Sequence, residues 1–214
     1  LSRYIDGIMI RTYRQSDVET LAECGTIPVI NGLTDSYHPC QVLADLQTVK
    51  EKKGKFKGLK LAYLGDGNNV ANSLLIGCAK VGMDITAATP EGYSCDPVAI
   101  SRAQEAAAET GAKVVLTTDP IEAAKDADVV YTDTWVSMGM EEEKEKRVQA
   151  FMPYQVNDEL FSKARPDALF MHCLPAYRGY EVTDSVIDGS RSIVFDQAEN
   201  RLHAQKAVLV KLMG

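Results

Sequence analysis

The sequence predicts an α/β fold, in which a doubly wound parallel sheet is preceded by the tail of a second α/β domain. From Leu59 onward, short apolar runs alternate with stretches of helical periodicity. This alternation is typical of the βαβ units that build a parallel sheet. Before Leu59 there are only two strand candidates, and two strands cannot bury both faces of a parallel sheet. We therefore expect the first lobe to be the C-terminal remnant of a larger domain.

In the first lobe, the sequence predicts strands at Ile5–Arg11 and Pro28–Leu33, with a helix over Asp17–Cys24 between them. The pair Asn31-Gly32 is a turn signal that we expect to end the second strand. A longer helix starts at His38-Pro39-Cys40-Gln41 and runs to about Lys53, because proline suits the first turn of a helix.

The second domain is predicted element by element from its periodicity. The expected strands are Leu59–Leu64, Met83–Ala88, Lys113–Thr117, Asp128–Thr132, Ala168–Met171 and Ile193–Asp196. The expected helices are Val70–Lys80, Pro97–Thr110, Ile121–Lys125 and Asn157–Ala164. A final helix, Glu199–Met213, is apolar nearly all round, so we expect it to be buried on more than one side and to pack back on the first lobe. The predicted units are residues 1–53, 54–198 and 199–214.

Composition limits the classes of function. The chain is 45% hydrophobic and 25% charged, as in ordinary globular proteins. Its net charge of −7 argues against nucleic acid as a partner, and its apolar runs are too short to span a membrane. Five cysteines without framework spacing indicate reduced thiols inside a cell. We expect a cytoplasmic protein, with the mitochondrial matrix as the alternative.

The strand candidate Ala168–Met171 brings His172, Cys173 and Leu174 to the carboxyl edge of the sheet, where ligands bind in open α/β folds. Pro175 should end this strand, because proline cannot donate to the ladder. A cysteine beside a histidine at such an edge is a candidate reactive thiol. The alternative is a buried core cysteine.

Two further segments are candidates for binding. His38 and Gln41 lie at a predicted helix N-terminus, which favours an anion, although His38 could simply cap the helix. Asp133–Gly139 leaves another strand end, where Asp133 could bind an ammonium group and Ser137 could form a hydrogen bond. A purely structural loop is the alternative. The charged stretch Glu141–Lys146 is interpreted as a solvated helix face.

Two cofactor hypotheses are disfavoured by the sequence. Gly65-Asp66-Gly67 follows a strand like a dinucleotide fingerprint, but Val70 replaces the third glycine. The neighbouring Asn68 and Asn69 better suit a carboxylate or an amino-acid backbone. A zinc ion held by His38, Cys40, His172 and Cys173 is disfavoured, since adjacent residues cannot easily share one tetrahedron and neither pair has zinc-finger spacing. We expect no metal.

Taken together, the segments resemble the carbamoyltransferase family. The residues that carry the resemblance are His38-Pro39-Cys40-Gln41, Gly65-Asp66-Gly67-Asn68-Asn69, Asp133 through Gly139, His172 through Pro175, and Glu199-Asn200-Arg201. These five motifs stand in family order and span nearly the whole chain. Ser137-Met138-Gly139 resembles the ornithine branch more than the aspartate or putrescine branches.

The resemblance implies transfer of a carbamoyl group from carbamoyl phosphate to the δ-amine of ornithine, without a metal or an organic cofactor. It implies catalytic roles for Cys173, His38 and Asp133, with Cys173 beside the reacting amine as proton acceptor or orienter. The residues implied for carbamoyl phosphate are His38, Gln41, Cys173, Leu174 and Arg201. Those implied for ornithine are Asn69, Asp133, Ser137 and Met138. A homotrimer is implied as well, with each active site completed by a phosphate loop of the neighbouring chain.

The front of the chain departs from the family pattern. The family's Ser-Thr-Arg-Thr phosphate loop and a further arginine for carbamoyl phosphate are expected upstream of Leu1, which is not an initiator methionine. We therefore expect the 214-residue chain to be incomplete for catalysis. Three alternatives remain: a chain that only binds its ligand, a carbamoyltransferase for another amine, and a nicotinamide-dependent enzyme.

Overall fold

The computed structural model describes residues 1–136 and 141–214, and it contains a five-stranded parallel sheet. The strands lie in the order β5-β4-β3-β6-β7, and every neighbouring pair is parallel. Their bounds are β3 Lys60–Leu64, β4 Asp84–Ala88, β5 Val114–Thr117, β6 Val129–Thr132 and β7 Leu169–His172. This arrangement confirms the predicted fold class.

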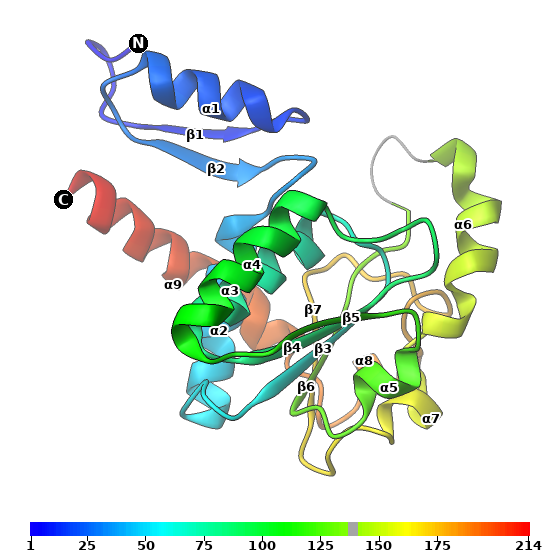
Figure 1. Cartoon of the computed structure of the whole chain (residues 1–214). Coiled ribbons are helices and arrows are strands. Elements are labelled where there is room, and N and C mark those ends of the chain that lie inside the picture. Colours follow the sequence, from blue (N-terminus) through cyan, green and yellow to red (C-terminus); the bar gives the residue numbers. More distant parts are fainter. Residues whose placement is uncertain (137–140) are drawn as a thin grey trace.

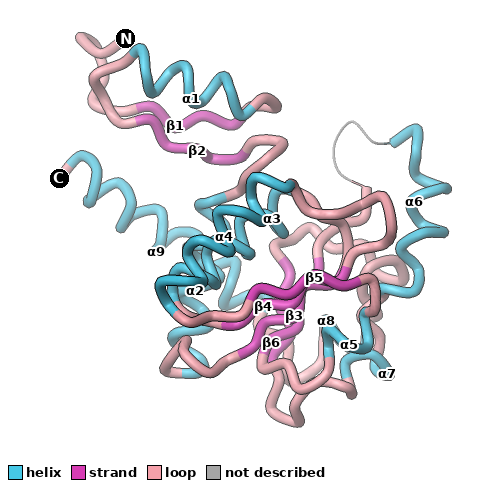
Figure 2. Tube along the Cα trace, viewed as in Figure 1, coloured by secondary structure: helices cyan, strands magenta, loops and turns pink. Residues whose placement is uncertain are grey.

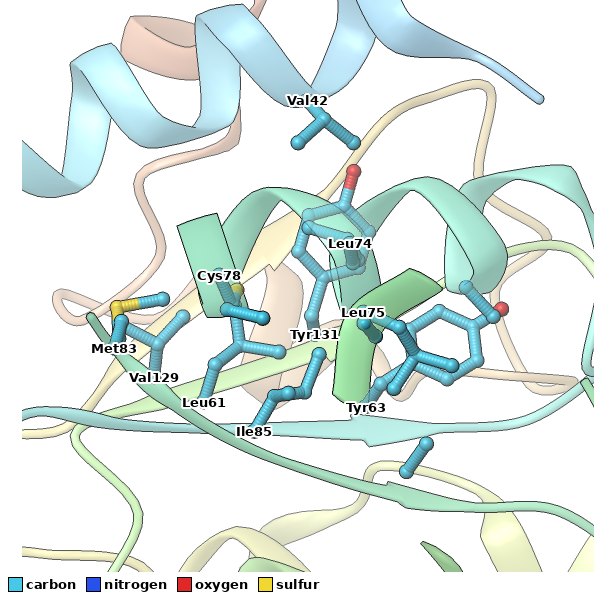
Figure 3. Packing of buried hydrophobic residues seen from close by; sticks show 14 of the residues in the cluster. Val42, Leu61, Tyr63, Leu74, Leu75, Cys78, Met83, Ile85, Val129 and Tyr131 are labelled. Atoms are coloured by element: carbon cyan, nitrogen blue, oxygen red, sulfur yellow. The ribbon is translucent and has the colours of Figure 1, made fainter. Parts of the chain in front are cut away.

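Helices cover both faces of this sheet, as Figures 1 and 2 show. One face carries α2 (Pro39–Lys53), α3 (Asn69–Val81) and α4 (Pro97–Thr110), and the other carries α5 (Pro120–Ala124), α7 (Asp158–Phe161) and α8 (Asp184–Ile187). Because successive strand residues point to opposite faces, each strand contributes to both cores. In β3, Leu61 and Tyr63 pack under α3 (Figure 3), whereas Ala62 and Leu64 face α5 and α7.

The first lobe is a parallel pair of strands, β1 (Ile8–Arg11) and β2 (Val29–Leu33), covered by α1 (Gln15–Cys24). The expected turn at Asn31-Gly32 is wrong, because β2 continues through both residues. The register shifts between Ile10 and Arg11, so Gly32 is the extra residue of a β-bulge. A Cβ on Gly32 would lie 2.7 Å from the Met9 sulfur, which explains the glycine.

The chain between β6 and β7 contains the 3₁₀ turn η1 (Glu141–Glu143), helix α6 (Lys144–Phe151) and a second 3₁₀ turn, η2 (Met152–Tyr154). The last helix, α9, spans Val194–Met213, so the strand expected at Ile193–Asp196 is wrong. Only Ser192 bridges to Phe170 of β7. A short apolar run is compatible with the periodicity of a helix as well as that of a strand, and here helix α9 begins shortly after this bridge.

Helix α9 lies along α2, and its last turns point toward the first lobe (Figure 1). Asn200 donates to the Thr48 hydroxyl at 3.0 Å, and Lys52 pairs with Asp196 at 3.0 Å. The C-terminal turn is more exposed than expected, since Val210 is 71% exposed. In the part of the chain that the structure describes, no helix combines the length and the apolar character needed to cross a membrane.

The strand order creates a switch point. From β3 the chain adds β4 and β5 on one side, and it then crosses to add β6 and β7 on the other side. The carboxyl ends of β3 and β6 are therefore adjacent, while the connections that leave them diverge. In open α/β sheets, ligands bind in the crevice at such a point.

Gly67 provides a test of how the switch-point loop packs. A Cβ on Gly67 would lie 2.3 Å from the backbone of Ser94 and Cys95. We expect Gly67→Ala to lower the free energy of unfolding by about 2 kcal/mol, as overpacking does. It should also expose the buried Cys95 thiol to alkylation.

Gly92→Ala is the control, because Gly92 has a positive φ and open space around it. This variant should lose only about 1 kcal/mol of the free energy of unfolding. Urea unfolding and mass spectrometry measure both effects, and equal behaviour of the two variants would contradict this packing.

Candidate active site

A cleft of about 930 Å³ opens at the switch point. It is bounded by the end of the first lobe, the N-termini of α2 and α3, the loops after β6 and β7, and helices α6 and α9. The candidate residues that line it are His38, Gln41, Asn69, Asp133, Cys173, Leu174 and Arg201. Ser137 and Met138 lie outside the described residues. Residues from five separate sequence motifs therefore meet at one place.

Asp133 is the central acceptor of the cleft. Its Oδ2 accepts from the Asn68 side chain at 2.7 Å, and its Oδ1 accepts from the Thr134 backbone N–H at 2.8 Å and from the Cys173 thiol at 3.0 Å. Asn68 also caps α3, since its Oδ1 accepts from the backbone N–H groups of Val70 and Ala71. The carboxylate is thus fixed by groups from three adjacent strand ends.

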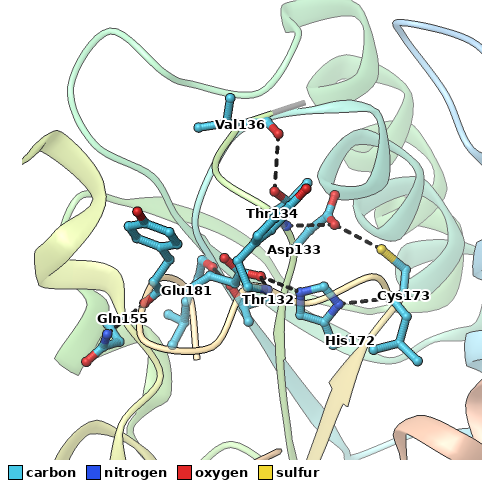
Figure 4. Close-up of polar contacts among 12 residues, drawn as sticks. Thr132, Asp133, Thr134, Val136, Gln155, His172, Cys173 and Glu181 are labelled. Carbon is cyan, nitrogen blue, oxygen red and sulfur yellow. Dashed lines mark hydrogen bonds and ion pairs between the residues drawn. The ribbon is translucent and has the colours of Figure 1, made fainter. Parts of the chain in front are cut away.

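The Cys173 thiol is a hydrogen-bond donor in this structure (Figure 4). Burial raises its pKa well above the usual range, and the Asp133 carboxylate raises it further by charge and by hydrogen bonding. The thiol is therefore neutral at pH 7 in the ligand-free site. A bound cation beside it would act in the opposite direction and lower its pKa.

His172 anchors the loop that carries Cys173. Its Nδ1 accepts from the Leu174 backbone N–H at 2.8 Å, and its Nε2 bonds to Glu181 Oε1 at 3.2 Å (Figure 4). The first contact requires the proton to be on Nε2. Glu181 Oε1 also accepts from the Tyr177 backbone N–H at 2.6 Å. The His172 ring is fully used in holding the loop.

This arrangement bears on metal binding. In the described residues, the donor atoms of Asp133, His172 and Cys173 lie within 4.8 Å of one another. However, both His172 nitrogens are occupied, and the thiol is protonated, whereas metal ligands must offer free lone pairs. The alternative zinc set gains no support, because Cys40 instead donates to the Asn31 carbonyl at 3.4 Å. The donor set fits a hydrogen-bond network better than a metal ion.

His38 lies at the N-terminus of α2, where its backbone N–H donates to the Ser73 hydroxyl at 2.8 Å. Its side chain does not cap the helix. Burial and the neighbouring Arg201 lower the pKa of the imidazole to about 4, so it is neutral at pH 7. Its Nδ1 is buried without a hydrogen-bond partner among the described residues. A neutral imidazole with a spare ring nitrogen can bind a ligand's polar group.

Asn69 joins the two lobes in this structure. Its Nδ2 donates to the Thr34 backbone carbonyl at 2.6 Å. Gln41 and Arg201 are joined directly, since the guanidinium donates to Gln41 Oε1 at 2.5 Å. Side chains from α2 and α9 thus form the part of the cleft that holds the Arg201 cation, which would favour an anion.

The Gly65-Asp66-Gly67 turn does not form a phosphate-binding loop. Gly67 lies against the backbone of Ser94 and Cys95, and its N–H donates to the Tyr93 carbonyl at 2.9 Å. The space that a pyrophosphate would need beside Gly67 is filled by this loop. The nicotinamide hypothesis therefore loses its only motif.

Comparison with known proteins decides the family. The family profile described as aspartate/ornithine carbamoyltransferase, Asp/Orn binding domain, matches residues 57–212. The profile described as the carbamoyl-P binding domain of the same family matches residues 1–51. The chain belongs to the aspartate/ornithine carbamoyltransferase family.

Relatives within this carbamoyltransferase family are similar along the whole chain. The ornithine carbamoyltransferase of Thermococcus kodakarensis is 60% identical over 214 residues, which are 100% of this chain and 68% of that protein. The solved ornithine carbamoyltransferase from Pyrococcus furiosus has a TM-score of 0.96 at 59% identity, covering 100% of this chain and 68% of that one. The Gloeobacter violaceus structure gives a TM-score of 0.93 at 55% identity, with coverage of 100% and 72%.

The structure of this carbamoyltransferase chain adds two arginines that the sequence analysis missed. Arg11, at the end of β1, lines the cleft. Arg147 follows the charged stretch interpreted as a solvated face, yet it is only 4% exposed. It forms an ion pair with Asp66 and lies over the Tyr93 ring at 4.9 Å. The position of Arg11 at the end of a predicted strand could have marked it as a candidate site residue. The contacts of Arg147 are with residues far away in the sequence, so the sequence carried no signal for them.

Thiol chemistry tests the charge environment of Cys173. We expect Asp133→Asn to speed alkylation of Cys173 by iodoacetamide near pH 8, because it removes a negative charge that raises the thiol pKa. Peptide mass spectrometry over a pH series gives the rate for each cysteine. Exposed Cys24 is the internal control and should react equally in both proteins. An unchanged rate at Cys173 would show that Asp133 does not control this thiol.

Proposed function

We propose that this chain carries out the transfer of a carbamoyl group from carbamoyl phosphate to the δ-amine of L-ornithine, giving L-citrulline and phosphate. The carrying observation is that one cleft combines groups of opposite chemistry. Arg11, Arg201 and neutral His38 lie near one another in it, and Asp133 lies beside Cys173. The first set suits an acyl phosphate dianion, and the second suits an amine. Family membership agrees with both assignments.

At the anion end, Arg201 and Arg11 neutralise the phosphate, whose negative charge grows as it leaves. His38 donates a hydrogen bond to the carbonyl oxygen, because a neutral imidazole carries one N–H and its ring lines the cleft. Gln41 contacts the carbamoyl group, and the Leu174 backbone lies beside it. Preorganised donors of this kind stabilise charge that develops in the transition state.

At the amine end, the δ-nitrogen must lose a proton before its lone pair attacks the carbonyl carbon and the C–O bond to phosphate breaks. Cys173 lies beside this nitrogen as proton acceptor or orienter. The cationic ornithine replaces the thiol as a partner of Asp133 and lowers the thiol pKa. Asn69, Asp133, Ser137 and Met138 hold the amino-acid end, and they fix the amine in line with the carbonyl carbon.

The assembly and setting belong to the same proposal. A homotrimer would let a neighbouring chain supply further phosphate contacts. A cytoplasmic enzyme of arginine metabolism, with the mitochondrial matrix as the alternative compartment, fits the reduced cysteines. A chain that only binds ornithine and a carbamoyltransferase for another amine are the competing functions, and one assay separates them.

That assay measures citrulline formation by a chimera, in which this chain replaces the matching residues of the Thermococcus kodakarensis relative. The rest of the chimera is then identical to the relative, which allows the two proteins to be compared. We expect turnover with ornithine and a kcat/KM about 10⁴-fold lower with putrescine, because putrescine leaves the groups for the α-amine and α-carboxylate unpaired. The unaltered relative is the control. Ornithine binding without turnover would support the binding-only function, and equal rates on both amines would support another substrate.

The second test concerns Cys173. In the same assay, Cys173→Ser should lower kcat and raise the KM for ornithine, since a hydroxyl is a poorer proton acceptor beside the amine. The KM for carbamoyl phosphate should change little. Cys24→Ser is the matched control, because Cys24 is exposed at the end of α1. If Cys173→Ser had wild-type kinetics, the role assigned to this thiol would be wrong.

A further inference from the structure

A buried carboxyl group lies directly beneath the anion end of the cleft. Asp45 is one helical turn after Gln41 in α2 and is 1% exposed. Its Oδ1 accepts from Gln41 Nε2 at 2.8 Å and from Gln197 Nε2 at 2.7 Å, while its Oδ2 accepts from the Tyr131 hydroxyl at 3.1 Å. None of these contacts reaches the ligand space, so the proposed mechanism does not use Asp45 directly.

The orientation of the two carboxamides that contact Asp45 is determined by their other partners. The Arg201 guanidinium has only donors, so the Gln41 atom that faces it must be Oε1. The Gln41 nitrogen then points to Asp45. On the other side, the His172 backbone N–H donates to Gln197 Oε1 at 3.0 Å, so the Gln197 nitrogen also points to Asp45. Two carboxamides, from α2 and α9, are therefore locked by one acceptor.

We propose that Asp45 is a positioning residue that holds the Gln41 carboxamide with its oxygen toward the cleft, and so selects an acyl phosphate whose acyl group carries N–H donors. The proposal rests on the proposed function, because it concerns the acyl donor of that reaction. A carbamoyl NH₂ can donate to the oxygen of Gln41. An acetyl methyl group of the same size cannot, and it leaves that oxygen without a ligand partner.

Without the acceptor at position 45, the Gln41 nitrogen would be buried without a partner, and only the bond from Arg201 would still hold the amide. The Gln41 oxygen would then be held less firmly toward the cleft, and the preference for an N–H group would fall. Asp45→Asn should behave differently, because its Oδ1 can still accept from Gln41 and Gln197. Its Nδ2 can donate to the Tyr131 oxygen, which already accepts from Gln197 Nε2 at 3.0 Å.

The test uses the chimera with the Thermococcus kodakarensis relative and measures two constants in each variant: the KM for carbamoyl phosphate and the inhibition constant of acetyl phosphate as its competitor. We expect the ratio of the inhibition constant to the KM to fall about tenfold in Asp45→Leu and Asp45→Ala, the loss of one hydrogen bond to a buried group. Asp45→Asn should keep the wild-type ratio. Asp45→Ala provides the same test if the larger side chain prevents the Asp45→Leu variant from folding.

Tyr131→Phe is the matched control. It removes a buried hydroxyl from the same network but leaves the bond between Asp45 and Gln41 intact, so it should lower stability without changing the ratio. A wild-type ratio in Asp45→Leu or Asp45→Ala would overturn the inference, as would a ratio that falls equally in Tyr131→Phe. If the wild-type chimera does not use carbamoyl phosphate at all, the proposed function fails instead, so the two failures are distinguishable.

Discussion

The site depends on the hydrogen bonds that the Asp133 carboxylate accepts at the switch point of the sheet. Its partners come from the ends of three neighbouring strands: Asn68 after β3, Thr134 after β6 itself and Cys173 after β7. Because these strands are adjacent and parallel, their carboxyl ends meet at one edge. The strand order therefore fixes the distance between the carboxylate and the thiol before any ligand binds. Preorganisation of this kind avoids the cost of ordering the groups during reaction.

The charges of the cleft follow from burial and from neighbouring groups. Burial and Arg201 lower the pKa of His38, and burial with Asp133 raises that of Cys173, so both side chains are neutral near pH 7. Burial likewise raises the pKa of Asp45, to about 7, although three hydrogen bonds oppose this shift. The resting cleft thus has Arg11 and Arg201 near His38, and the Asp133 carboxylate beside the Cys173 thiol. A dianionic phosphate and a cationic amine complement these two sets of charges, so the cleft is suited to hold both substrates of the proposed reaction together.

The sequence predicted the sheet because its strands are apolar runs of regular spacing, and it predicted Asp133 and Cys173 because both directly follow such runs. It failed where tertiary contacts decide the outcome. Ile193–Asp196 is as apolar as a strand, yet among the described residues this region pairs with β7 only through the bridge at Ser192. Arg147 stands beside exposed charges in the sequence, and only the fold brings it against Asp66. The link from Asp45 to Gln197 joins residues far apart in the chain, so local periodicity carries no signal for it.

A crystal structure of the chimera with L-ornithine bound tests the central claim most directly. The account predicts that one amino nitrogen of ornithine lies within hydrogen-bond distance of the Asp133 carboxylate, and that the δ-nitrogen lies beside the Cys173 sulfur. The thiol should then no longer donate to Asp133, while the bonds from Asn68 and Thr134 to the carboxylate persist. Ornithine bound away from Asp133, or with its δ-nitrogen directed away from Cys173, would contradict the account.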